Sequence, residues 1–150
     1  MPSFKTNRRI AHSAANMFDL VADAERYPQF LPLCEALRIR GRQEMGEGRS
    51  VIVADMTVGY KAIRETFTSR VVLDKSAGTI RVAYLDGPFQ HLDNLWTFRA
   101  VDETTCEVGF SIDYAFKNRM LGAVMGAMFD KAFRKFAEAF EKRANEVYGH

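Results

Sequence analysis

The stretch NRMLGAVMGAMFDKAFRKFAEAFEKRANEV, residues 118–147, decides the fold expected for this chain. It contains no proline, and its apolar residues recur every three or four positions, which is the spacing of one face of a helix. Charged residues such as Lys131, Arg134 and Glu138 occupy the opposite face. The pattern predicts one amphipathic helix of about thirty residues, roughly 45 Å long at 1.5 Å per residue.

The residues before this helix follow a different period. From Glu35 to about Phe116, apolar and polar residues alternate in runs that are separated by the turns Gly46–Gly48, Ser76–Gly78 and Asp86–Pro88. Alternation with short turns predicts strands joined as an antiparallel meander. An edge strand is also expected at residues 3–10. We therefore expect an α+β fold, in which a curved antiparallel sheet of six to seven strands wraps around the long C-terminal helix.

Two short helices are expected between the first strand and the meander. Ser13 is a good N-cap for a helix whose apolar residues include Met17 and Val21. This helix must end near Tyr27-Pro28, because a residue before proline disfavours the α region. The following stretch, up to Cys34, is rich in proline and aromatic residues, and it could serve as a portal to a cavity or as a plug.

Length and composition narrow the classes of protein. The 150 residues fit one domain over residues 1–150, and 21 basic against 19 acidic residues make nucleic acid an unlikely main partner. Cys34 and Cys106 lack a CxxC partner, so neither a disulfide framework nor a zinc site is expected. No apolar run approaches the ~20 residues of a membrane-spanning helix. The first residues lack the apolar region of a secretory signal, which predicts a cytoplasmic location.

The first half of the predicted helix, Met120–Phe133, is rich in flexible, small and aromatic side chains. Methionine adapts to irregular apolar shapes, so this half could line a ligand cavity. The alternative is an ordinary core, and the spacing alone favours the core. The candidate ligand-binding residues here are Met120, Val124, Met125, Met128, Phe129 and Phe133.

The strands and the proline-rich stretch supply the other candidates. Asn94 shares a face with two aromatic residues, and its amide could bind a ligand carbonyl. Glu65 lies on an apolar face, where a carboxylate needs a partner; Arg81 or Arg99 could form that ion pair, and a ligand head group is the alternative. The complete set outside the helix is Tyr27, Phe30, Leu31, Glu65, Phe67, Phe89, Asn94, Trp96 and Phe98.

Neither a catalytic nor a metal-binding residue is expected. The three histidines do not form HxH or HExxH, and the chain lacks GxSxG and the glycine-rich phosphate loops. If the chain were an enzyme, Glu65 and His91 would be the acid–base candidates. Together these observations favour binding over catalysis.

Four segments together resemble the coenzyme-Q-binding START-like family: YPQFLPLC (27–34), GPFQHL (87–92), WTF (96–98) and FKNRML (116–121). That family belongs to the polyketide cyclase/dehydrase and lipid-transport superfamily and has the helix-grip fold. The resemblance covers essentially the whole chain. It implies a curved sheet that grips the C-terminal helix around an apolar tunnel for a polyprenylated quinone.

The resemblance also implies a function. Family members act as non-enzymatic carriers or chaperones that deliver ubiquinone for respiration and assist its synthesis, so ubiquinone would be a bound ligand and not a cofactor. A cytoplasmic protein that transiently visits the inner membrane is the corresponding expectation. Some bacterial relatives with similar motifs are described as ribosome-associated toxins. A ribosome-binding protein and a cyclase acting on a poly-keto chain therefore stay open, as does the oligomeric state.

Overall fold

The computed structural model describes residues 3–149. Its elements follow one another in the order strand, two short helices, six strands, two helices. Their bounds are β1 (Ser3–Ile10), α1 (Ala14–Ala22), the 3₁₀-helix η1 (Ala24–Gln29), β2 (Cys34–Gly46), β3 (Arg49–Tyr60), β4 (Ile63–Asp74), β5 (Thr79–Asp86), β6 (Phe89–Ala100), β7 (Cys106–Phe116), α2 (Arg119–Arg134) and α3 (Phe136–Tyr148).

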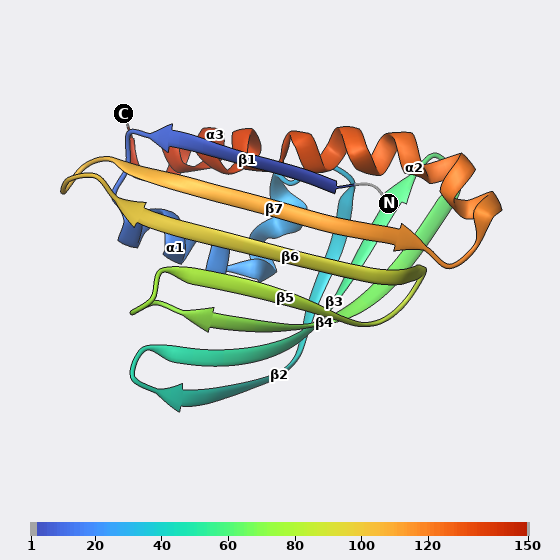
Figure 1. The fold of residues 1–150 in the computed structure, drawn as a ribbon, viewed down its shortest axis with the longest axis horizontal. Coiled ribbons are helices and arrows are strands. Elements are labelled where there is room, and N and C mark those ends of the chain that lie inside the picture. The colour runs from blue at the N-terminus through green and yellow to red at the C-terminus, as the bar shows by residue number, and fades with distance from the viewer. Residues whose placement is uncertain (1–2, 150) are drawn as a thin grey trace.

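The seven strands form one antiparallel sheet in the order β1-β7-β6-β5-β4-β3-β2. The expected α+β fold with a curved antiparallel sheet and covering C-terminal helices is confirmed. Strands β3 and β4 bend, so that the ends joined at residues 60–63 lie near α2 (Figure 1). Register shifts in β2, including one between Ile39 and Gly41, contribute to the curvature at this edge because a bulge bends and twists its strand.

The expected single helix from Asn118 to Val147 is instead two helices that lie end to end (Figure 1). Lys135 separates them, and its amide donates to the Ala132 carbonyl at 3.0 Å, three residues back. In a 3₁₀-type turn of this kind, the side chains of residues i and i+3 lie on the same side of the helix. Phe133 and Phe136, on either side of Lys135, both face the sheet as walls of one cavity. Periodicity could not reveal this break, because the apolar pattern runs through it.

The first helix also ends earlier than expected. Ser13 caps α1 as predicted, with its side chain accepting from the Asn16 amide at 3.1 Å. However, α1 ends at Ala22, and Pro28 lies inside η1. The hydroxyl of Tyr27 donates to the carbonyl of Val21. Because the last carbonyls of a helix lack partners within it, this contact stabilises the early end.

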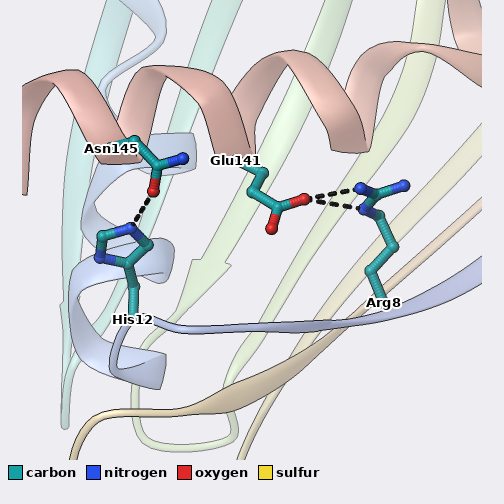
Figure 2. Close-up of polar contacts among 4 residues, drawn as sticks. All are labelled: Arg8, His12, Glu141 and Asn145. Carbon is teal, nitrogen blue, oxygen red and sulfur yellow. Dashed lines mark hydrogen bonds and ion pairs between the residues drawn. The ribbon is translucent and has the colours of Figure 1, made fainter. Parts of the chain in front are cut away.

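Polar contacts attach α3 to the N-terminal part of the chain. Arg8 in β1 donates through Nε and Nη2 to Glu141 Oε1, at 3.2 and 2.6 Å (Figure 2). The Nε2 atom of His12 lies 2.7 Å from Oδ1 of Asn145, which is one turn further along α3 than Glu141 (Figure 2). Since an amide oxygen only accepts, Nε2 carries a proton in this contact. Within residues 3–149, none of the helices is both long and apolar enough to cross a bilayer.

The Arg8–Glu141 pair is expected to contribute modestly to stability. Both side chains are partly exposed, at 41% and 28%, so solvent screens the attraction. A double-mutant cycle with Arg8→Ala and Glu141→Ala, followed by urea denaturation, should give a coupling free energy of about 0.5–1 kcal/mol. A coupling near zero would mean that packing alone holds α3 against β1.

Candidate functional site

An apolar cavity of about 90 Å³ lies between the inner face of the sheet, the segment around η1 and the C-terminal helices. Strands β3 to β7 contribute side chains that alternate along each strand, as expected for one face of a sheet. The helices contribute Phe133, Phe136 and Phe140. The remaining walls are Val21, Ala22, Ala24, Tyr27, Leu31, Leu37, Ile52, Ala54, Met56, Phe67, Ser69, Val71, Leu73, Ile80, Val82, Leu92, Asn94, Trp96, Phe110 and Ile112.

Three of these wall residues carry a hydroxyl or amide group, namely Tyr27, Ser69 and Asn94, and Trp96 adds an indole N–H. The Tyr27 hydroxyl is engaged by the Val21 carbonyl, and burial raises the pKa of this phenol above its ordinary value. Asn94 donates from Nδ2 to the Ser111 carbonyl at 2.8 Å. The Ser69 hydroxyl is buried and lacks a hydrogen-bond partner among the described residues. The cavity can therefore bury hydrocarbon and offer a few hydrogen bonds.

Several residues expected to bind a ligand lie in the cavity wall. They come from η1 and the turn after it, from β4 and β6, and from the end of α2. These residues are Tyr27, Leu31, Phe67, Asn94, Trp96 and Phe133. Phe129 lies in the wall of a smaller apolar space that also contacts Phe67 and Phe133. Their place in the wall leaves their role as ligand contacts a prediction.

The remaining candidates lie outside the cavity wall. Phe89 and Phe98 are core residues: Phe89 packs against Phe67, and Phe98 against Phe18, with ring centroids 5.4 and 5.6 Å apart. Phe30 packs on Phe140 at 5.1 Å, outside the cavity.

The helix residues of this group need the clearest correction. Met120 and Val124 are 74% and 53% exposed, Met128 is half-buried, and Met125 is fully buried in the core. From the C-terminal helices the cavity is therefore lined by Phe133, Phe136 and Phe140, and within the expected stretch Met120–Phe133 only the last residue lies in its wall. The physical reason is that α2 packs beside the end of β7, where Phe129 contacts Phe116 at a centroid distance of 5.4 Å, outside the wall of the cavity.

The partners expected for Glu65 are also wrong. Arg81 pairs with Asp93 at 3.5 Å, and Arg99 pairs with Glu107 at 2.5 Å. Glu65 is half-buried, forms no ion pair within residues 3–149 and lies outside the cavity wall. Its position near the end of β4 leaves the carboxylate partly hydrated, so no buried partner is needed.

Two further spaces adjoin the cavity and share wall residues with it. Beyond Phe67 and Met56 lies a small apolar space of about 20 Å³, whose walls include Pro32 and Leu33. This places the proline-rich stretch beside the cavity, and both a portal and a plug stay open as its role.

On the opposite side, beyond Ala22 and Leu73, an open groove of about 300 Å³ is lined by charged residues. Arg42, Arg49 and Lys75 are among them. The three spaces form a row along the inner face of the sheet, with an apolar end and a charged end.

Sequence reasoning missed Ser69. It stands between Phe67 and Val71 on the alternating apolar face of β4, and all three line the cavity. The available signal was a lone hydroxyl at a period-two position of an otherwise apolar face, because such a group must find a partner when it is buried.

Cys34 is buried and free, and burial raises the pKa of its thiol to about 11. Because the thiolate is the reactive form, Cys34 is not set up as a nucleophile.

In a Cys106→Ala variant at pH 8, we expect Cys34 of the folded protein to react with a disulfide reagent at least about a hundredfold more slowly than in urea. The rate in the folded protein should keep rising up to about pH 11, whereas in urea it should level off near pH 9. Equal rates would show that the thiol is accessible and ionised.

Known proteins share similarity with this chain over most of its length. Residues 10–141 match the family model described as polyketide cyclase / dehydrase and lipid transport. The ribosome association toxin RatA of Pseudomonas aeruginosa is 32% identical over 140 residues, which cover 93% of each chain. The coenzyme Q-binding protein COQ10 homolog B of Xenopus laevis is 25% identical over 150 residues, covering 97% of this chain and 59% of that one.

A solved structure agrees with both findings. An 18 kDa protein from Caulobacter crescentus is 33% identical, covers all of both chains and superimposes with a TM-score of 0.79. The matched region includes every strand from β2 to β7, all of α2 and the first part of α3. This chain belongs to the polyketide cyclase/dehydrase and lipid-transport family.

Proposed function

We propose that this protein binds a hydrophobic small molecule between its sheet and its C-terminal helices and carries it without chemical change. A polyprenylated quinone such as ubiquinone, or a similar lipid, is the leading ligand. The observation that supports this proposal most is the apolar cavity with Trp96, Phe133 and Phe140 in its walls. Apolar area buried there contributes roughly 25 cal/mol per Å² before entropic costs.

The size of the cavity limits which ligands it can hold without a change in structure. A volume of about 90 Å³ is smaller than the ~150 Å³ of an apolar cavity that holds benzene. A ring-sized head group therefore requires the walls to move. The walls best suited to move are Phe133 and Phe136, because they flank the helix break at Lys135, while Glu141 and Asn145 hold α3 in place.

The chemistry of the walls supports binding without catalysis. General acid–base catalysis needs a titratable group within hydrogen-bond reach of the reacting atoms. Of the described wall residues, Tyr27 is the titratable one, and its hydroxyl is already bonded to the Val21 carbonyl. The acid–base candidates Glu65 and His91 lie outside the wall.

Trp96 provides the test. It is the only tryptophan of the chain and is 4% exposed in the cavity wall, so a bound quinone should quench its fluorescence. Titration with decylubiquinone should give saturable quenching, and organic extraction of the freshly purified protein followed by mass spectrometry should release a lipid or quinone. Failure of both measurements would overturn the proposal.

A second candidate is association with the ribosome, which the similarity to RatA favours. On this chain, Arg38, Arg40 and Arg42 are exposed along the edge strand β2 and could contact phosphate. Co-sedimentation with ribosomal subunits over a salt series should then show binding that weakens steeply with salt, and less steeply in a triple Arg→Ala variant. Absence of co-sedimentation at low salt would remove this candidate.

A cytoplasmic location with brief contacts at the inner membrane stays a prediction under either function.

A further inference from the structure

Ser69 presents an unused hydroxyl to the cavity. The residue is 5% exposed, and its Oγ has no hydrogen-bond partner among the described residues. Its neighbours on the same face, Phe67 and Val71, also line the cavity, so the side chain faces the same space. A buried hydroxyl without a partner destabilises the folded chain. A ligand oxygen or a water molecule at this position would remove that cost.

Asn94 presents a second polar atom to the same space. The residue is 8% exposed, and its Nδ2 donates to the carbonyl of Ser111 at 2.8 Å. This bond fixes the orientation of the amide. Its Oδ1 accepts no hydrogen bond from the described residues, and it is therefore available to a hydroxyl group or to water.

The sheet register places these two groups apart from each other. Asn94 pairs with Val82 of β5, and Ser69 pairs with Tyr84, two residues further along the same strand. Two strand spacings and two residues separate their Cα atoms by roughly 12 Å on a flat sheet. The two side chains are therefore too far apart to satisfy each other, and an oxygen-bearing ring between them could reach either.

The spaces on either side of the cavity also indicate how a bound ligand would be oriented. Along β4, the space beyond Leu73 is the groove with Arg42, Arg49 and Lys75, whereas the space beyond Phe67 is apolar. A hydrocarbon tail fits the apolar side. A head group would then lie in the centre, next to Ser69 and Asn94.

We infer that the ligand places an oxygen-bearing head inside the cavity, hydrogen-bonded to Ser69, while its tail extends toward Pro32 and Leu33. This inference rests on the proposed function and makes it more specific. Ser69 becomes a specificity-determining residue that separates oxygenated ligands, such as quinones, from plain hydrocarbons of the same shape. The discrimination arises because a hydrocarbon leaves the buried hydroxyl without a partner.

The test is a cycle of one substitution against two probes. Decylubiquinone and decylbenzene have the same ten-carbon tail, and only the first carries oxygens on its ring. Affinities for both are measured by displacement of a fluorescent fatty-acid analogue from wild type and from Ser69→Ala. The control is Ser111→Ala, the same change on the outer face of the sheet. Thermal melting of each variant, without ligand, checks that the fold is retained.

We expect Ser69→Ala to weaken decylubiquinone about five- to tenfold and to leave decylbenzene unchanged or slightly tighter, whereas Ser111→Ala should change neither. If both probes bind wild type and Ser69→Ala affects them equally or not at all, the inference is overturned and the cavity hydroxyl serves water only. If neither probe binds wild type, the proposed function fails and this inference fails with it.

Discussion

Replacing Phe140 with alanine is expected to lower the free energy of unfolding by about 3–4 kcal/mol. Phe140 is 1% exposed, and its ring contacts Tyr27, Phe30 and Trp96 at centroid distances of 5.3, 5.1 and 5.1 Å. It thus joins α3, the segment around η1 and the sheet at a single point. Alanine would leave a void among these rings, which cannot collapse freely because the segment around η1 holds two of them and the sheet holds the third.

Urea denaturation followed by circular dichroism measures this loss. Phe140→Leu is the matched control, since it keeps most of the buried volume and should cost less than about 1.5 kcal/mol. Because Phe140 also lines the cavity, the alanine variant should accept larger ligands if it folds. A loss below about 1 kcal/mol would mean that the segment around η1 is not packed against α3 in solution.

The sheet could be predicted from the sequence because its signals are local. Alternation along β3 to β7 and the turns at Gly46–Gly48 and Ser76–Gly78 locate the strands, and Ser13 marks the start of α1. The helix break at Lys135 could not be predicted in this way. It depends on how Phe133 and Phe136 meet the sheet, and that contact is between residues far apart in sequence.

The candidate site was predictable in type but less so in position. A Met-rich helix half suggested an adaptable wall, yet Met120 and Val124 face solvent, because an amphipathic pattern does not show which apolar residues cover the cavity and which extend beyond the sheet. Asn94 and Trp96 were identified because they share one strand face. Ser69 was missed because a serine in a strand is usually solvated, and the sequence does not show that this hydroxyl is buried without a hydrogen-bond partner.

Filling the cavity should separate ligand binding from stability. Ala54 is 7% exposed in the wall and pairs with Ile39 on one side and Ser69 on the other. Ala54→Leu adds three carbon atoms at the centre of the space. We expect binding of decylubiquinone to weaken by more than about tenfold, while the free energy of unfolding changes by no more than about 1 kcal/mol, because the added atoms occupy a volume that is already empty.

The measurements are tryptophan quenching and urea denaturation on the same samples, and the control is Ala83→Leu, since Ala83 is exposed on the outer face of β5. If the cavity were only a packing defect, Ala54→Leu would leave any ligand binding intact. If the cavity binds the ligand, affinity must fall in Ala54→Leu while stability is kept, whereas Phe140→Ala lowers stability and enlarges the ligand space. Unchanged affinity in Ala54→Leu would place the ligand elsewhere on the molecule, with the charged groove around Arg42 and Lys75 as the nearest alternative.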